Sequence, residues 1–250
     1  MIASTSEWSI TNEQYDAIVK TFPEQDRVRF IDSGQRRKLV NELVRIWVLC
    51  ADARKHGVDI GSDFESQRNY YQQFAKDIAA SITPDVVRNY YDIHPDEFAM
   101  LGLSQILILN GNSPVTPFPD VQRLPYKEAE SKARDIKAML DKGADWDEMV
   151  QKYSQDLSTK DNGGRVGYIS TGQVEKSIDN ALLSIKAGEI SDVVGSVYGF
   201  HILRLDDKKI KPFEDIQDTL REKLINEETN RQFEAKVKAA NVSIDESFFE

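Results

Sequence analysis

The residues best suited to chemistry lie in two distant segments of the chain. Residues 153–168 read YSQDLSTKDNGGRVGY, a polar loop that carries Asp156 and contains two adjacent glycines. Residues 198–203 read YGFHIL, a short predicted strand that carries His201. Taken singly, these residues have simple structural interpretations: a turn aspartate, a hydrogen-bonded histidine, and glycines that allow positive φ rather than bind phosphate. Any chemical role therefore depends on what surrounds them.

The composition argues against several classes of partner. The 250 residues carry 42 acidic and 32 basic side chains, which gives a formal net charge of −10. No large segment is basic, so neither a nucleic acid nor an anionic membrane surface is indicated as a partner. No apolar run approaches the roughly 18 residues of a membrane-spanning helix. The first residues, MIASTSEW, do not read as a signal peptide, so the chain is either cytoplasmic or a mature form after export.

Metal and redox chemistry are not indicated either. Cys50 is the single cysteine and stands in an apolar helical run, where a buried, inert thiol is expected. The three histidines, His56, His94 and His201, lie far apart in the sequence, which argues against a Cys/His metal site. The sequence therefore predicts neither a metal nor another cofactor.

Helical patterns occupy both ends of the chain. Apolar residues recur at helical spacing in four segments, approximately 35–56, 64–81, 84–93 and 213–240. The last of these needs apolar partners, and the unmatched apolar faces are those of the first three. We therefore predict that residues 1–97 and 210–250 build one helical domain, in which the C-terminal helix packs on the N-terminal helices.

The pattern changes between these ends, in residues 98–209. Short apolar runs predict strands, amphipathic runs predict helices, and a proline-rich stretch at 110–125 predicts a surface loop. The predicted strands are 103–109, 166–169, a short one near 193, and 200–205, and the predicted helices are 126–142, 145–153 and 180–183. The resulting order, β-α-α-β-α-β-β, predicts an α+β module inserted into the helical domain.

This module resembles the parvulin-type (PpiC, rotamase) peptidyl-prolyl isomerases. The matching motifs are the helix GADWDEMVQKYS, the loop QDLSTKDNGGRVGYI, the segment TGQVEKSIDNAL, the turn IKAGEIS and the strand YGFHILRL. The flanking helical segments resemble those of the SurA/PrsA/PpiC-type foldase-chaperones of the bacterial cell envelope. The resemblance implies a small antiparallel sheet with surrounding helices, inserted into an all-α chaperone domain.

The resemblance assigns four polar residues to the catalytic positions. His201 matches the histidine of the last strand, Asp156 matches the central aspartate or cysteine, and Ser196 matches a supporting hydroxyl. Gln105 stands where the family has a histidine on its first strand. Two roles are open for its amide, a structural hydrogen bond to His201 or a hydrogen bond donated to the substrate carbonyl.

The substrate pocket of the family falls on four apolar residues that are smaller than usual. Val166, Ile169, Val174 and Ile178 replace a leucine, a phenylalanine, a methionine and a phenylalanine. These four could equally be core residues. The loop at 110–125 carries one base, Arg123, so selection of phosphoserine-proline is not indicated.

The resemblance implies a foldase of the periplasm or cell envelope. It would bind unfolded or nascent exported polypeptides and proline-containing peptides, and would isomerise X–Pro bonds. The missing histidine and the smaller pocket predict weak activity. The alternative is a non-catalytic, SurA-like chaperone whose parvulin domain only binds peptide. Neither reading requires a nucleic acid or a metal, and any membrane proximity would come from a segment outside this sequence.

Overall fold

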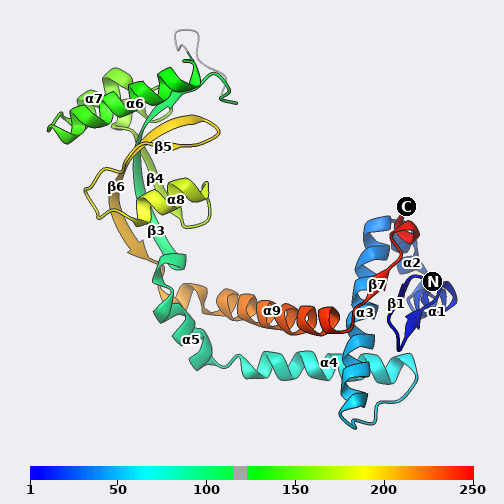
Figure 1. The fold of residues 1–250 in the computed structure, drawn as a ribbon. Coiled ribbons are helices and arrows are strands. Elements are labelled where there is room, and N and C mark those ends of the chain that lie inside the picture. The colour runs from blue at the N-terminus through cyan, green and yellow to red at the C-terminus, as the bar shows by residue number, and fades with distance from the viewer. Residues whose placement is uncertain (115–122) are drawn as a thin grey trace. The chain divides into compact units, whose positions relative to one another are not determined.

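The chain forms two compact units whose boundaries lie within helices (Figure 1). In the computed structural model, residues 1–114 and 123–250 are described. The terminal unit comprises residues 1–87 and 217–250, and the central unit comprises residues 88–216. The predicted class, a small antiparallel sheet with surrounding helices set within helical segments, is confirmed. The 110–125 loop carries a single base, which gave no indication of phosphoserine-proline selection. Part of that loop lies outside the described residues.

The terminal unit is mainly helical and also contains a small sheet. Its helices are α1 (Asn12–Val19), α2 (Glu24–Arg27), α3 (Ser33–Lys55), α4 (Phe64–Ser81) and the first turn of α5 (Pro84–Ile93), together with most of α9 (Phe213–Ala239). Strands β1 (Ala3–Ser4), β2 (Ser9–Ile10) and β7 (Ser243–Ile244) form an antiparallel sheet in the order β2-β1-β7. The resemblance implied an all-α domain here, so this sheet is a correction to that expectation: its strands are too short to show an alternating pattern in the sequence, and it joins residues 3–4 to residues 243–244.

The helices of the terminal unit begin where the sequence supplies caps. The Asp32 side chain accepts a hydrogen bond from the backbone N–H of Gln35 and caps α3, and Asp63 does the same for α4 through Ser66. The apolar stripe predicted for α3 is largely buried, with Leu39, Leu43 and Ile46 inside the core. The helices therefore start at local signals and are held by an apolar face.

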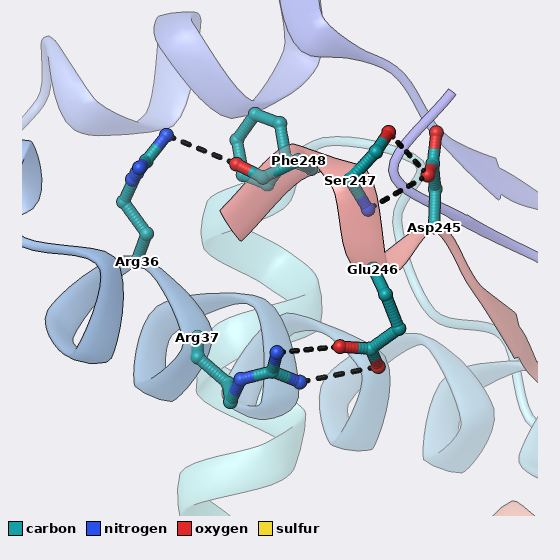
Figure 2. A network of polar contacts seen from close by, with 6 residues as sticks. All are labelled: Arg36, Arg37, Asp245, Glu246, Ser247 and Phe248. Carbon is teal, nitrogen blue, oxygen red and sulfur yellow. Dashed lines mark hydrogen bonds and ion pairs between the residues drawn. The ribbon is translucent and has the colours of Figure 1, made fainter. Parts of the chain in front are cut away.

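The C-terminal segment is bound to α3 by polar contacts (Figure 2). Arg36 donates from Nη1 to the backbone oxygen of Phe248 at 2.9 Å, and Arg37 forms a two-pronged ion pair with Glu246. The ring of Phe248 meets the ring of Tyr15 edge-on at 5.1 Å. Segments from both ends of the chain thus share the core of this unit.

The central unit is built on one four-stranded antiparallel sheet. Strands β3 (Ala99–Leu109), β4 (Arg165–Ser170), β5 (Val194–Gly195) and β6 (Gly199–Ile210) lie in the order β4-β3-β6-β5. One face packs on α6 (Tyr126–Asp141) and α7 (Trp146–Tyr153) through Ile106, Ile108 and their neighbours. The other face packs on α8 (Lys176–Leu183) through Leu101, Leu103 and their neighbours. The order of elements within residues 99–210 is the predicted one.

Candidate functional site

Strand register places Gln105 and His201 on the same face of the sheet. In the β3–β6 ladder, Gln105 pairs with Leu203 and Leu107 pairs with His201. Side chains of paired residues share a face, and residues two apart on one strand do so as well. The two polar side chains are therefore diagonal neighbours on the face that also carries Leu103 and packs on α8.

A continuous hydrogen-bond chain joins the four polar candidates. The Ser196 hydroxyl lies 2.6 Å from Nε2 of His201, and Nδ1 of His201 lies 2.9 Å from Oε1 of Gln105. Nε2 of Gln105 donates to Oδ2 of Asp156 at 2.8 Å. Residues from β3, from β6, from the turn between β5 and β6 and from the loop after α7 thus meet in one network. Of the two roles considered for the Gln105 amide, the hydrogen bond to His201 is the structural one.

The network has one consistent direction. An ionised carboxylate only accepts hydrogen bonds, so Gln105 turns its N–H group toward Asp156 and its oxygen toward His201. His201 must then donate from Nδ1, which leaves Nε2 to accept from the Ser196 hydroxyl. The hydroxyl oxygen in turn accepts the backbone N–H of Tyr198 at 3.0 Å. An amide in this place therefore fixes the tautomer of the histidine.

The loop that carries Asp156 is tied to strand β3. The backbone N–H of Gln155 donates to the oxygen of Leu107 at 2.8 Å, and its side-chain oxygen accepts the N–H of Leu109 at 2.6 Å. The Ser154 hydroxyl accepts the N–H of Leu107 at 3.3 Å. These bonds hold the carboxylate of Asp156 beside the sheet.

Hydroxyl groups near Asp156 complete its surroundings. Its Oδ1 accepts the Ser158 hydroxyl at 2.6 Å, and its Oδ2 accepts the Thr159 hydroxyl at 2.7 Å. Burial alone would raise the pKa of Asp156, but hydrogen bonds from Ser158, Thr159 and Gln105 outweigh it and hold that pKa below its ordinary value. Sequence analysis missed both hydroxyls, although the D-x-S-T spacing is typical of an aspartate that bonds the residues just after it.

His201 is held in its neutral form. It is only 3% exposed, and this burial lowers its pKa from 6.5 to about 4, while the nearby charge of Asp156 opposes the shift. The ring is therefore uncharged at neutral pH, as the direction of the network requires. Protonation would place a second donor on Nε2, opposite a hydroxyl that now donates to it.

This burial predicts that acid destabilises the central unit. The unfolded chain binds a proton on His201 near pH 6.5 and the folded chain only near pH 4, so stability falls as pH drops through this window. The shift corresponds to about 3 kcal/mol. Urea unfolding at several pH values should show this loss, and His201→Gln should show less of it. Exposed His56 gives the control His56→Gln, and an equal loss in both variants would contradict the assignment.

The second glycine of the doublet fixes the loop against β3. The N–H of Gln105 donates to the oxygen of Gly164 at 2.8 Å, and Gly164 has φ +75°. A Cβ atom there would lie 2.4 Å from the backbone oxygen of Gln105. Only glycine fits so close to the strand in this conformation.

The four apolar candidates do not all lie in one cluster. Ile178 is buried on α8, and Ile169 and Val174 are partly buried against the same cluster as Leu101 and Leu203. Val166 is 43% exposed and stands at the irregularity of the β3–β4 pairing, where Ser104 pairs with Arg165. The structure thus joins three of the four, with the fourth open to solvent.

The described part of the chain holds no group of three His, Cys, Asp or Glu side chains that could bind a metal ion.

A family model described as the PPIC-type PPIASE domain matches residues 93–209. Foldase protein PrsA 2 of Bacillus cereus is 29% identical over 199 residues, which cover 77% of this chain and 61% of that protein. Foldase protein PrsA of Caldanaerobacter subterraneus is 30% identical over 174 residues, 68% of this chain and 50% of that protein. The chain thus spans between half and two thirds of the length of these relatives.

Among solved structures, a peptidylprolyl isomerase (PrsA) from Bacillus anthracis aligns with 24% identity and a TM-score of 0.40. The alignment covers 96% of this chain and 94% of that one. The corresponding protein from Bacillus cereus aligns with 19% identity and a TM-score of 0.46, covering 95% and 89%.

Proposed function

Since residues 93–209 belong to the PPIC-type PPIASE domain family, we propose that this chain is a foldase that isomerises X–Pro peptide bonds in unfolded polypeptides. The observation that carries the proposal is the directed chain from Ser196 through His201 and Gln105 to Asp156. It joins two polar side chains of the sheet, Gln105 and His201, to Ser196 and Asp156 from adjoining loops, next to the apolar cluster that packs on α8. The named relatives, which are foldases, support the same activity.

The reaction needs positioning rather than covalent chemistry. Rotation about an X–Pro bond crosses a barrier of roughly 20 kcal/mol, so uncatalysed exchange takes on the order of 10–100 s. Apolar surroundings disfavour the charge-separated planar amide, and hydrogen bonds to the twisted amide favour the transition state. A dry surface with a few oriented polar groups is therefore sufficient.

Gln105 can serve both roles that the sequence left open. Its oxygen bonds His201 and one of its two N–H groups bonds Asp156. We propose that the second N–H donates to the substrate carbonyl, while Ser196 and His201 hold the amide in place. Ile169, Val174 and Ile178 would hold the proline ring, with Val166 at the exposed edge. This wall lacks aromatic residues, so we propose reduced turnover.

The test is prolyl exchange measured by NMR on several X–Pro peptides with the full chain. We expect catalysis, and Asp156→Ala should lower it by about tenfold or more, because Gln105 loses the partner that orients it. Asp161→Ala removes an exposed acid of the same loop and should leave the rate unchanged.

Two results would contradict the proposed activity. Equal rates for Asp156→Ala and the unmutated chain would remove Asp156 from the site. No catalysis by the unmutated chain, with peptide-induced shifts between Val166 and Ile178, would identify the alternative, a non-catalytic chaperone whose parvulin domain only binds peptide.

We also propose a location in the cell envelope or periplasm, where exported polypeptides fold. The proposal rests on the resemblance of the flanking helices to envelope foldases. No helix among the described residues is long and apolar enough to cross a membrane. Fractionation of the source cells tests it, and recovery of the protein with cytoplasmic markers would contradict it.

A further inference from the structure

Thr159 lies outside the four polar candidates but is bonded to their carboxylate. Its hydroxyl donates to Oδ2 of Asp156 at 2.7 Å, and the same oxygen accepts a hydrogen bond from Nε2 of Gln105 at 2.8 Å. Ser158 instead donates to the other oxygen, Oδ1, from its hydroxyl at 2.6 Å and from its backbone N–H at 3.1 Å. Thr159 therefore shares with Gln105 the carboxylate oxygen that orients the amide.

The backbone of Thr159 closes a ring of hydrogen bonds with the same amide residue. Its carbonyl oxygen accepts the N–H of Gly164 at 2.9 Å, and the oxygen of Gly164 accepts the N–H of Gln105 at 2.8 Å. The carbonyl oxygen of Thr159 also accepts the N–H of Asn162 at 3.1 Å. One loop residue thus reaches Gln105 twice, at its side chain through Asp156 and at its backbone through Gly164.

The Thr159 hydroxyl limits what the carboxylate can accept. Thr159 is only 8% exposed, so water does not readily take the place of its hydroxyl. Each carboxylate oxygen offers two lone pairs, and on Oδ2 the Thr159 hydroxyl occupies one and Nε2 of Gln105 the other. The second N–H of Gln105 therefore finds no acceptor site on Oδ2 and is left for a substrate carbonyl. Without the hydroxyl, one lone pair would be open and the amide would lose its single orientation.

We infer that Thr159 is a positioning residue for the proposed isomerisation. It acts in three steps: its hydroxyl fixes the carboxylate of Asp156, the carboxylate fixes the amide of Gln105, and the amide oxygen fixes the tautomer of His201. The inference rests on the proposed function, which names the substrate carbonyl as the group that the amide serves. The orientation of the amide can also be measured without any turnover.

Thr159→Val tests this role, because valine has nearly the shape of threonine but no hydroxyl. Prolyl exchange on a short X–Pro peptide should show kcat lowered about fivefold in the full chain with KM nearly unchanged, since the lost orientation matters in the transition state. Thr159→Ser restores the hydroxyl and should recover most of the rate. Thr159→Ala removes the hydroxyl with less bulk and should repeat the loss.

The ring nitrogen NMR shifts of His201 supply a readout that does not depend on catalysis. The unmutated chain should show one neutral tautomer, with the proton on Nδ1. Thr159→Val and Thr159→Ala should each show a mixture of both tautomers, because the released amide of Gln105 can turn its N–H group toward the ring. Thr159→Ser should show the single tautomer again.

Ser158→Ala is the matched control for the charge of the carboxylate. Burial raises the pKa of Asp156, and the hydroxyls of Ser158 and Thr159 both lower it, so loss of either hydroxyl raises that pKa. Only loss of the Thr159 hydroxyl opens the oxygen that Gln105 uses. Ser158→Ala should therefore keep a single tautomer of His201.

The outcomes separate this inference from the proposed activity. A single His201 tautomer in Thr159→Val and Thr159→Ala would overturn the inference, and so would a loss of rate that Thr159→Ser does not recover, because Thr159 would then act through packing alone. A tautomer mixture in both variants, together with no catalysis by the unmutated chain, would support Thr159 as the residue that positions the amide and would contradict the proposed activity.

Discussion

Gly164→Ala is expected to destabilise the central unit by about 3 kcal/mol more than Gly143→Ala. Both glycines have positive φ, +75° and +90°, so both variants carry a similar backbone strain of roughly 1 kcal/mol. The two positions differ in the room available for an added Cβ atom. A Cβ at Gly164 would lie 2.4 Å from the backbone oxygen of Gln105, while a Cβ at Gly143 would meet nothing within 4 Å. The excess combines overpacking against a backbone atom with loss of the bond from Gln105 to Gly164.

Denaturant unfolding followed by tryptophan fluorescence measures this difference. Trp146 donates its indole N–H to the oxygen of Gly163 at 2.9 Å, so it reports on the loop at the substituted residue. Prolyl exchange under native conditions should also fall in Gly164→Ala, because the strand must move at Gln105. Equal stability of the two variants would mean that the loop moves away from β3 at little cost, and that Gly164 does not fix the site.

The sequence alone predicted those elements in which apolar side chains recur at a regular spacing. Helix α4 spans the residues that spacing predicted, 64–81, and the β-α-α-β-α-β-β order of the central unit was also predicted. Strands β3 and β6 were predicted too short. The unpredicted residues of β6, such as Asp207 and Lys209, are polar and resemble a loop, yet they pair with Gly102 and Met100 of β3. Backbone pairing with a neighbouring strand sets the length of such a strand, and this pairing cannot be predicted from the spacing of apolar residues within one segment.

The small sheet of the terminal unit shows the same limit. Its strands are two residues long, too short for an alternating pattern, and the pairing joins Ala3 with Ile244 across the chain. Contacts of such sequence separation depend on the tertiary fold. The geometry of the candidate site depends on it in the same way, since motifs could group Asp156, His201, Ser196 and Gln105 but could not give the order of the hydrogen bonds among them.

Phe233→Ala is expected to destabilise the terminal unit by about 3–5 kcal/mol. Helix α9 is polar over most of its surface, and Leu220 and Phe233 are its two buried residues. Phe233 is fully buried and meets the rings of Tyr71 at 5.2 Å and Phe74 at 5.6 Å. Its removal leaves a cavity between α9 and α4 that two aromatic rings cannot close without leaving their own positions. One residue thus holds much of the contact between the C-terminal helix and the N-terminal helices.

Hydrogen exchange measured by mass spectrometry locates the effect within the chain. Protection should fall in α3 and α4 and stay unchanged in β3 and β6, whose sheet belongs to the central unit. Ile31→Ala removes an apolar side chain that is 77% exposed in the same unit, and should change stability by less than about 0.5 kcal/mol. If Phe233→Ala left α3 and α4 as protected as Ile31→Ala does, the N-terminal helices would be stable without the C-terminal one. The terminal unit would then be a helical domain with an attached helix rather than one core built from both ends.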